Sequence, residues 1–503
     1  MNFTRPTLYP PAIKTPFPKN PRIFHHPSSL LTAQLASLSR KLHPSSLVTP
    51  LKSLSKSPSS RLSLRTKCTI ADQQLAQPKE TGVVIVGAGL AGLAAALRLN
   101  SSQIPFLLFE ASDSVGGRVR TDSVDGFLLD RGFQIFITAY PEAQKLLDYE
   151  SLNLQKFYSG ALVYYNGGFH RVSDPLRHFW DSLGTITNPI GSITDKVLIG
   201  LSRLKAAASS FEDLLVAPES STRERLLRDG FSSSIIGRFF VPFLGGIFFD
   251  AKLDTTSRLY DFVFKSLALG SNTLPSKGIG AIPDQLASRL PDFCLKLNSK
   301  VTKLNSDLST VELENGEVFR GKFGLILGVE EPEAKRLLET EEAALANAKV
   351  KPCRSTVCLY FGADDAPIKE PILILNGSGK GIVNNMFFAT NVASSYGPKG
   401  KTLVSVSLVG SYESWSDEEL QNAVREEMGT WFAGSVVKAW NHLRTYRIGF
   451  AQPNQIPPTN LRKDPRVGPG VYACGDYRDS ATFDGALVSG RRAAEALIED
   501  NGW

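Results

Sequence analysis

The sequence has few of the residues that usually bind metals or build disulfide frameworks. It contains five cysteines, and no two of them form a C-x-x-C pair. Beyond residue 70 the histidines are His170, His178 and His442, which are scattered and lack the spacing of metal ligands. The pattern indicates neither a zinc ribbon nor a dithiol redox centre, and we predict no metal site.

Long apolar runs are also missing. No stretch of eighteen consecutive apolar residues occurs, although a helix that crosses a bilayer needs about that length. We therefore predict no membrane-spanning helix, whereas peripheral contact with a membrane stays open.

Acidic residues are absent from the first part of the chain, since none precedes Asp72. Residues 1–70 hold eleven Lys or Arg, twelve Ser and ten Pro, a composition typical of a disordered transit peptide. The serine content and the length favour a chloroplast (plastid) over a mitochondrion, with removal near Cys68 to Asp72. The alternative is a disordered basic tail that binds nucleic acid or a membrane. Removing those 11 bases from 56 leaves 45 against 49 acids, a net charge of −4, so we expect no nucleic-acid partner.

The most informative segment that is present combines a buried strand, a glycine turn and a helix. The apolar run Val83–Val86 leads into a G-x-G-x-x-G motif at Gly87, Gly89 and Gly92. In such a motif the first glycine makes the tight turn, the second lets backbone approach a diphosphate, and the third lets helix and strand pack closely. Glu110 follows Gly92 by eighteen residues, where an acid meets a ribose 2′-hydroxyl. The pattern predicts a dinucleotide site, and the alternative is a plain turn.

Two further segments carry glycines beside charged residues. The loop Gly116–Arg118 supplies backbone N–H groups and a guanidinium, which suit a second approach to the diphosphate; its alternative is a solvent-exposed loop. Near the end of the chain, the strand Gly470–Cys474 leads to Gly475–Asp476, and Gly485 begins an alanine-rich helix. The order of strand, glycine and helix is the same as in the first motif.

The middle of the chain changes in character. Residues 139–270 have helical patterns, and the uncharged segment Phe239–Phe249 carries five phenylalanines that either line an apolar pocket or form ordinary core. Further on, strands are predicted at several positions and helices at others, with a hairpin turn at Asn315–Gly316. The expected strands are Lys296–Asn305, Thr310–Leu313, Val318–Arg320, Phe323–Val329, Ser355–Phe361 and Thr402–Leu408, and the clearest helices are Val197–Leu204, Thr222–Arg228 and Glu331–Leu338.

Taken together, Gly87–Gly92, Glu110, Gly116–Arg118, Gly475–Asp476 and Gly485–Leu487 resemble the FAD-dependent family that contains amine oxidases, protoporphyrinogen oxidases and carotenoid desaturases. The resemblance covers roughly residues 81–500, and the three motifs occur in the family's order. Read alone, the first motif allows several dinucleotides. The resemblance makes FAD the expected cofactor.

The resemblance implies an α/β fold in which a Rossmann-type FAD-binding domain, with a parallel sheet and a β-hairpin sheet, is interleaved with an α+β substrate domain. At 503 residues the chain exceeds one usual core, which agrees with two domains. We expect the FAD-binding domain at 81–138, 272–338 and 460–500, and the substrate domain at 139–271 and 339–459.

The resemblance also implies roles for individual residues. Glu110 would hold the adenosine ribose, Arg118 the diphosphate, Val301 the adenine through its backbone, and Asp476 the ribityl or phosphate portion. The helix that starts near Gly485 would direct its N-terminus at the flavin pyrimidine edge, where negative charge gathers on reduction. The full set of expected cofactor-binding residues is Gly87, Ala88, Gly89, Leu90, Ala91, Gly92, Glu110, Ala111, Gly117, Arg118, Val301, Gly475, Asp476, Gly485, Ala486 and Leu487.

Two positions separate this chain from the amine oxidases that it resembles. Cys358 stands where those enzymes carry a lysine, and Thr482 stands where they place a cage tyrosine. The C-terminal segment Gly475–Gly490 is similar to the signature of plant and cyanobacterial carotenoid desaturases, with shorter spacing. A primary amine is therefore a less suitable substrate than an isoprenoid.

We expect an FAD-dependent oxidoreductase that takes hydride from a hydrophobic, isoprenoid- or carotenoid-like plastid substrate. No catalytic side chain is assigned, because the flavin performs the chemistry and the protein positions the substrate. A single dinucleotide fingerprint leaves no separate site for NADPH, so the acceptor is dioxygen or a quinone. The alternatives are a redox-neutral flavin-dependent isomerase, a flavin amine oxidase, and a flavoprotein scaffold without turnover.

Overall fold

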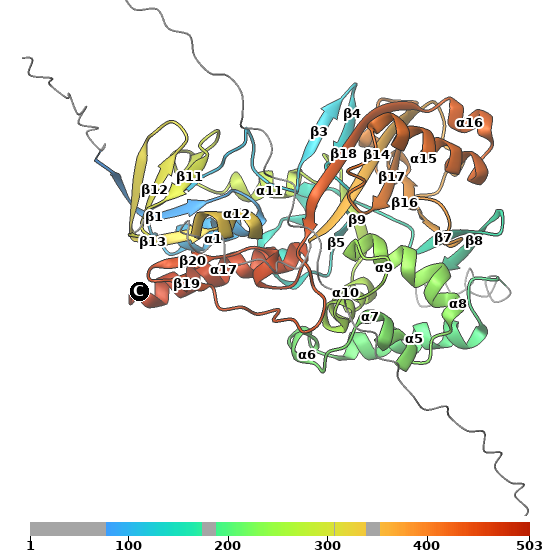
Figure 1. Cartoon of the computed structure of the whole chain (residues 1–503), viewed down its shortest axis with the longest axis horizontal. Coiled ribbons are helices and arrows are strands. Elements are labelled where there is room, and N and C mark those ends of the chain that lie inside the picture. Colours follow the sequence, from blue (N-terminus) through green and yellow to red (C-terminus); the bar gives the residue numbers. More distant parts are fainter. Residues whose placement is uncertain (1–76, 174–187, 306, 339–352) are drawn as a thin grey trace, which may run out of the picture. The chain divides into compact units, whose positions relative to one another are not determined.

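The computed structural model describes residues 77–173, 188–305, 307–338 and 353–503. The predicted transit peptide, residues 1–70, lies outside these residues, as do His178 and short parts of both ranges predicted for the substrate domain. The fold class is α/β, as predicted, and two large sheets organise it (Figure 1).

The first sheet has eight strands and contains the predicted fingerprint strand at its centre. Strand β1 pairs in parallel with β2 on one side and with β13 on the other, and β20 extends the parallel part beyond β13. The strands are β10 (Leu295–Lys296), β2 (Phe106–Phe109), β1 (Lys79–Val86), β13 (Val318–Leu327), β12 (Thr310–Leu313) and β11 (Val301–Leu304), with β20 (Val471–Ala473) on β13 and β19 (Arg466–Gly468) on β20.

Helices from both ends of the chain cover this sheet. Helix α1 packs along α17, and Figure 1 shows the two beside β1, β13 and β20. The missing Cβ of Gly490 allows this approach, because a Cβ there would lie 2.0 Å from the carbonyl oxygen of Ala91. The helices associated with this sheet are α1 (Leu90–Ser101), α11 (Ala281–Ala287), η2 (Asp292–Cys294), α12 (Glu331–Leu338), η4 (Asp476–Arg478) and α17 (Phe483–Asp500).

The structure corrects two strand predictions here. The strands predicted at Val318–Arg320 and Phe323–Val329 form one strand, β13, because Gly321 and Gly324 let the chain bend without leaving the sheet. The strand predicted at Lys296–Asn305 is divided into β10 and β11, since the intervening turn folds back to Glu110, whose carbonyl oxygen accepts the Ser299 N–H at 2.8 Å. The hairpin at Asn315–Gly316 is confirmed.

The second sheet has seven strands. One of its faces packs against α15 and α16, and the other faces α9 and the rest of the main hydrophobic core. Its strands are, in order, β18 (Asn441–Gln452), β14 (Arg354–Ala363), β17 (Thr402–Val409), β16 (Val383–Phe388), β15 (Leu373–Asn376), β7 (Gly160–Tyr165) and β8 (Gly168–Ser173), with α15 at Asp417–Trp431, α16 at Gly434–Lys438, α14 at Ala389–Val392 and η3 at Ser394–Tyr396.

Two small sheets and a group of helices complete the described chain. The ribbon of β3 (Thr121–Val124) and β4 (Phe127–Asp130) and the sheet of β5 (Phe136–Ile137), β9 (Asn272–Pro275) and β6 (Leu154–Lys156) connect the larger layers. The helix predicted at Thr222–Arg228 is confirmed, and the one at Val197–Leu204 is part of a longer helix. The helices are α2 (Pro141–Leu146), α3 (Tyr149–Leu152), α5 (Ile193–Ala208), α6 (Phe211–Val216), α7 (Thr222–Arg228), α8 (Ser233–Ile235), η1 (Ile236–Phe240), α9 (Val241–Phe248) and α10 (Ser257–Leu269).

No helix in the described ranges has both the length and the apolar character needed to cross a bilayer.

Candidate flavin and substrate site

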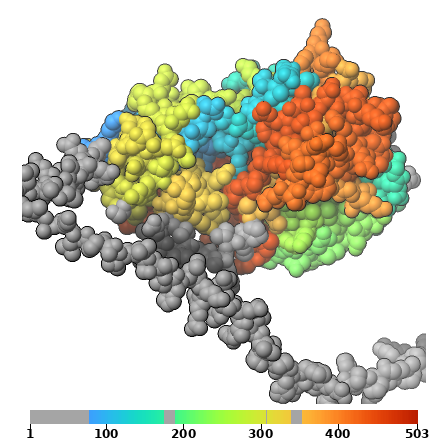
Figure 2. Space-filling view, turned by 45° about the horizontal axis from the view of Figure 1, so that its top comes forward, coloured from blue at the N-terminus to red at the C-terminus, as the bar shows by residue number. Residues whose placement is uncertain are grey.

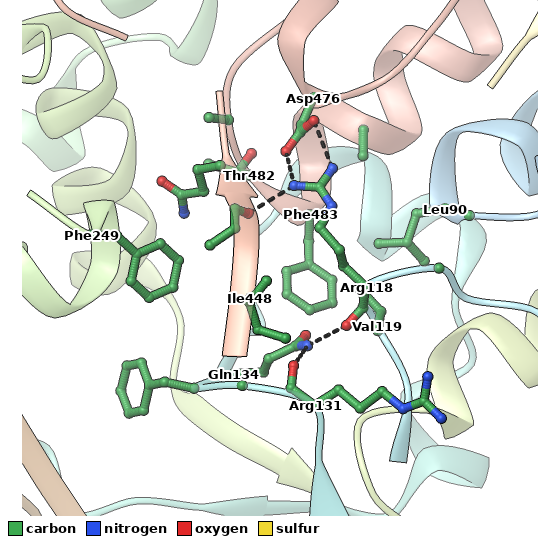
Figure 3. Close-up of a pocket in the computed structure, with 18 of the residues that line it drawn as sticks. Leu90, Arg118, Val119, Arg131, Gln134, Phe249, Ile448, Asp476, Thr482 and Phe483 are labelled. Atoms are coloured by element: carbon green, nitrogen blue, oxygen red, sulfur yellow. Dashed lines mark hydrogen bonds and ion pairs between the residues drawn. The ribbon is translucent and has the colours of Figure 1, made fainter. Parts of the chain in front are cut away.

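A cavity of about 450 Å³ lies among residues that are far apart in the sequence, a volume within the usual range for ligand sites. Its lining comes from the loops after β1 and β4, from α9, from β14 and β18, and from the start of α17. Figure 2 shows the surface hollowed between blue and yellow segments on one side and orange segments on the other. Figure 3 shows part of the lining.

The N-terminus of α1 opens into this cavity. Gly89 is the N-cap residue, and no side chain caps the helix, so the first N–H groups of α1 remain available to a ligand. A Cβ on Gly89 would meet nothing within 4 Å, and one on Gly117 would meet only the Gly89 Cα at 3.7 Å. An open, glycine-lined space before a helix N-terminus fits a diphosphate group.

Glu110 is held at the edge of the same space. Its Oε2 accepts the Ala88 N–H at 2.7 Å, and its Oε1 accepts the N–H and the hydroxyl of Ser112 at 3.0 and 2.7 Å. These bonds fix the carboxylate at the end of β2, where it lines the cavity. A fixed carboxylate beside a diphosphate space fits the recognition of a ribose hydroxyl.

Arg118 and Asp476 form a bidentate ion pair in the cavity wall, although 358 positions separate them. The two N–O distances are 2.8 and 2.9 Å, and Arg118 also donates to the carbonyl oxygen of Ala451 at 2.8 Å (Figure 3). Burial lowers the pKa of Arg118, but Asp476 and Glu330 more than offset this effect and raise it. Arg118 therefore compensates the negative charge of Asp476 beside the glycine-lined space at the N-terminus of α1.

The start of α17 forms another part of the wall. The helix begins at Phe483, two residues before the predicted Gly485, because the Thr482 hydroxyl caps it by accepting the Gly485 N–H at 3.0 Å. Thr482, Phe483 and Ala486 line the cavity, so the positive end of this helix dipole points to it.

The remaining wall is mainly apolar. The phenylalanine segment Phe239–Phe249 contributes both to the core and to an apolar pocket, the two alternatives predicted for it. Phe240 packs in the core, while Phe243 and Phe249 line the cavity. Phe249 ends α9 in the left-handed region, with φ 49°. The apolar lining residues in this part of the cavity are Phe133, Ile135, Ile137, Phe243, Ile247, Phe248, Phe249, Leu267, Leu373, Ile448 and Phe483.

The structure brings ten of the predicted cofactor-binding residues to the cavity: Gly87, Gly89, Leu90, Ala91, Glu110, Gly117, Arg118, Gly475, Asp476 and Ala486. It places the others around these. Ala88 donates its N–H to Glu110, and Ala111 is the exposed residue that follows Glu110. Gly92 and Gly485 lie against the carbonyl oxygens of Gly87 and Ser480, while Val301 and Leu487 are core residues.

Position 358 does not contribute to the cavity. Cys358 is fully buried, and burial raises the pKa of its thiol to about 11. Thr356, two residues earlier on the same face of β14, lines the cavity instead, and its hydroxyl donates to the carbonyl oxygen of Leu408 at 2.8 Å. Of these two side chains, only that of Thr356 is reached from the cavity. It is neutral, and its hydroxyl already donates a hydrogen bond within the protein.

Several residues that line the cavity had no predicted role. The loop after β4, which includes Phe133 and Gln134, contributes to the wall, as do Gly328–Glu330 and Tyr140. The glycine break at Gly132 was visible in the sequence, and a glycine after a short strand is a signal for close backbone approach. Tyr140 carried no signal, because only packing brings it to the cavity.

No group of three or more His, Cys, Asp or Glu side chains in the described residues is placed to hold a metal ion.

The fold and this cavity define a class: an α/β protein with a dinucleotide-binding fingerprint at a cavity that has a glycine-rich part and an apolar part. Residues 90–498 match the family described as flavin containing amine oxidoreductase, and the chain belongs to that family. The protein is an FAD-dependent oxidoreductase, which confirms the predicted cofactor and class.

Three curated relatives show the range of the family. The protein is 28% identical over 229 residues to protoporphyrinogen oxidase 2, chloroplastic/mitochondrial, of Arabidopsis thaliana, an alignment that covers 44% of this chain and only 42% of that protein. It is 24% identical to coproporphyrinogen III oxidase of Bacillus subtilis, covering 69% of this chain and 82% of that protein. It is 23% identical to the chloroplastic/chromoplastic 15-cis-phytoene desaturase of Glycine max, covering 84% and 80%.

Solved structures agree in fold. An oxidoreductase from Methanosarcina mazei superposes with a TM-score of 0.63 at 18% identity, covering 83% of this chain and all of that one. Wild-type putrescine oxidase bound to putrescine superposes with a TM-score of 0.59 at 17% identity, covering 84% of this chain and all of that one. At these identities the likeness concerns the fold alone.

Proposed function

We propose that the protein oxidises a hydrophobic, isoprenoid- or carotenoid-like molecule, with dioxygen or a quinone as the final acceptor. The observation that carries this proposal is the apolar wall described above. Arg131 also lines the cavity, but its guanidinium already donates two hydrogen bonds to the Asp122 carboxylate, at 3.0 and 2.9 Å. A cavity of this kind favours a neutral apolar substrate over an amine or a carboxylate, because either charged group would lose its hydration without gaining a partner.

The cofactor would lie between the two glycine-rich regions. We assign the diphosphate to the N-terminus of α1 and to Arg118, the ribose to Glu110, the adenine to the backbone of Val301, and the ribityl or phosphate portion to Asp476. The dipole of α17 would favour negative charge at the flavin pyrimidine edge. When bound, FAD supplies the two-electron acceptor for the substrate's hydride.

The chain's own residues would orient the substrate and keep water away from it. Phe249, Ile448 and Phe483 lie around one region of the cavity in Figure 3, where they would hold an apolar chain by contact alone. Gln134 cannot reorient freely, because its amide donates to the carbonyl oxygens of Arg118 and Arg131 at 2.6 and 2.9 Å. We assign no general base, since positioning suffices for hydride loss from an activated carbon.

The strand composition of the two large sheets supports the predicted division of the chain into an FAD-binding domain and a substrate domain. The eight-stranded sheet draws its strands from the ranges 81–138, 272–338 and 460–500, with β1 beginning two residues earlier at Lys79. The seven-stranded sheet draws its strands from 139–271 and 339–459. We propose that the first sheet organises the FAD-binding domain and the second the substrate domain.

A chloroplast location, reached through a transit peptide in residues 1–70, is part of the proposal. The composition of that segment supports it, as do the relatives from Arabidopsis thaliana, Glycine max and Nicotiana tabacum, whose names include the chloroplast.

We also propose peripheral contact with a thylakoid or envelope membrane through an apolar stripe on α5. Its members, Ile193, Val197, Leu201 and Leu204, follow one another at helical spacing, and each is more than half exposed. Exposed apolar side chains on one helix face mark an interaction surface. In flotation with galactolipid vesicles, Val197→Glu with Leu201→Glu should abolish co-migration, whereas Leu227→Glu, an equally exposed leucine on α7, should not; equal flotation of all three proteins would refute the contact.

The central test uses purified holoenzyme without oxygen. Addition of apolar plastid lipid extract should bleach the flavin absorbance, and readmission of dioxygen or a quinone should restore it. Bleaching by polyamines but never by the extract would overturn the proposal. Product formation from the extract without any bleaching or acceptor would instead identify a redox-neutral isomerase.

A further inference from the structure

Most polar side chains in the cavity wall already have protein partners. The amide of Gln134 donates twice to backbone, that of Gln452 donates to the Ile247 carbonyl oxygen at 2.9 Å, and the Thr356 hydroxyl donates to the Leu408 carbonyl oxygen. Two lining residues differ. The hydroxyl of Tyr140 and the amide of Asn272 form no hydrogen bond with any residue that the structure describes.

These two residues are neighbours in the fold. Asn272 in β9 is the Cα partner of Ile137 in β5, and the Tyr140 N–H donates to the carbonyl oxygen of Ile137 at 3.4 Å. The chain therefore turns from β5 into α2 beside β9, which places both residues at one corner of the cavity lining. Leu267 from α10 lines the cavity at the same junction.

The ring of Tyr140 has little freedom to move away from this corner. It stacks on Phe262 and meets Phe136 edge-on, each at a centroid distance of 6.2 Å, and only 5% of the residue is exposed. The hydroxyl can rotate, but the oxygen stays in place. An almost buried polar group without a protein partner is costly unless a ligand or water completes its bonding.

The charges around this corner decide which ligand fits. Burial, and then the nearby Asp484 carboxylate, raise the pKa of Tyr140, so the phenol stays neutral. The same carboxylate disfavours an anionic ligand, and the cavity-lining residues of β5, β9 and α10, which are Ile137, Asn272 and Leu267, include no Lys or Arg. Asp484 does not line the cavity and its Oδ1 already accepts the N–H groups of Glu142 and Ala143, so it offers no direct partner to an ammonium group.

We propose that Tyr140 and Asn272 form a polar subsite that binds a neutral oxygen, either a hydroxyl or a carbonyl, carried by an otherwise apolar substrate. The tyrosine donates or accepts one hydrogen bond, and the asparagine amide can do both. The preferred substrate is accordingly an oxygenated isoprenoid rather than a pure hydrocarbon. This inference rests on the proposed function, because it assumes that the cavity receives an apolar molecule.

The test measures binding to holoenzyme by the perturbation of the flavin spectrum, using geranylgeraniol and the hydrocarbon of the same skeleton that lacks the hydroxyl. The wild-type protein should bind the alcohol more tightly. Tyr140→Phe and Asn272→Ala should each weaken alcohol binding about ten-fold, equal to about 1.4 kcal/mol, and leave hydrocarbon binding unchanged. Tyr149→Phe is the matched control, because that hydroxyl donates to the Thr138 carbonyl oxygen outside the cavity lining.

The outcomes separate the two proposals. Equal affinity of the wild-type protein for both probes, or equal weakening of both by Tyr140→Phe, would overturn the polar subsite while leaving the apolar cavity as proposed. Failure of both probes to bind the wild-type holoenzyme would overturn the proposed function itself. Each variant is first shown to carry a full complement of FAD, so a loss of folding cannot imitate a loss of contact.

Discussion

Three glycines within six residues serve three different physical purposes. Gly87 has φ 94°, which other residues adopt only with strain. Gly92 has ordinary dihedral angles, but a Cβ there would lie 1.9 Å from the carbonyl oxygen of Gly87. Gly89 is constrained by neither effect, since its φ is −71° and the space before it is open. The folded protein does not itself require glycine at position 89, which agrees with the proposal that a ligand occupies the space before it.

Gly89→Val should fold normally and lose FAD, because the new side chain enters only the space assigned to the diphosphate. We expect an unchanged melting temperature of the apoprotein together with a flavin-to-protein ratio near zero. Gly449→Val, at an exposed strand position where a Cβ also meets nothing within 4 Å, is the matched control and should stay fully loaded. A yellow Gly89→Val protein with undiminished flavin would refute the assignment.

Glu110→Ala should weaken FAD binding by about 1.5 to 3 kcal/mol, the usual contribution of a hydrogen bond to a charged group. Part of that loss comes from the Ala88 N–H, which would lose its acceptor. Glu110→Gln keeps an acceptor for that N–H and should therefore show a smaller loss. Fluorescence titration of apoprotein with FAD measures both, and unchanged affinity in Glu110→Ala would move the ribose contact elsewhere.

At the scale of elements, one short segment organises two helix ends. Thr482 caps α17, and Asp484 in the first turn of α17 accepts the N–H groups of Glu142 and Ala143 at 2.7 and 3.1 Å, which caps α2. Helix α2 has no cap from its own neighbouring side chains. The start of α17 is thereby fixed against α2 at the cavity wall, so the positive end of its dipole keeps its direction toward the cavity.

Thr482→Ala should lower the free energy of unfolding by about 1 kcal/mol, since it removes the cap of α17. Thr482→Ser keeps the hydroxyl and should restore most of the loss. Urea denaturation of the two variants and the wild-type protein measures the difference. If serine and alanine destabilise equally, the methyl group of Thr482 matters rather than its hydroxyl, and the capping role is wrong.

At the scale of the whole described molecule, Asp130 links the β3–β4 ribbon to the seven-stranded sheet. Its carboxylate accepts bonds from the Thr121 hydroxyl at 2.6 Å, the Ile279 N–H at 2.9 Å and the Tyr396 hydroxyl at 2.9 Å. Its carbonyl oxygen accepts the Tyr360 hydroxyl of β14 at 2.9 Å. Burial raises the pKa of Asp130 to about 6 despite these bonds. A single buried acid thus joins the β3–β4 ribbon to the seven-stranded sheet.

The raised pKa predicts a specific pH dependence of stability. Between about pH 4 and 6 the folded protein holds a proton on Asp130 that the unfolded chain has released, so stability falls as pH rises through this window. Asp130→Asn should remove this part of the decline, which is worth roughly 3 kcal/mol for a shift of about two units. Asp484 has a similarly raised pKa of about 6, and its share of the decline should remain in the variant.

Denaturant unfolding at several pH values measures this effect as the difference between variant and wild type. Asp125→Asn, at an exposed turn position, is the control and should leave the pH profile unchanged. Parallel profiles of Asp130→Asn and the wild-type protein would show that Asp130 is ionised across the whole window, contrary to the expectation.

The local features of this protein follow from residues that are neighbours in the sequence. The fingerprint Gly87–Gly92, Glu110 and the hairpin at Asn315–Gly316 could be predicted because turn geometry, helix starts and strand patterns depend on neighbouring residues. These features, in their order along the chain, were enough to identify the FAD-dependent class. They did not reveal that the two strands predicted at Val318–Arg320 and Phe323–Val329 would form the single strand β13, because whether a strand continues through glycines is decided by its pairing in the sheet.

Which residues line the cavity depends on the tertiary structure. Arg118 meets Asp476, Thr356 rather than Cys358 faces the cavity, and Tyr140 and Asn272 share one corner. None of these arrangements follows from spacing along the chain, because they depend on how the layers pack and on how far along a strand the cavity extends. The cofactor could therefore be predicted from the sequence, whereas the apolar character of the cavity is a property of the packed fold.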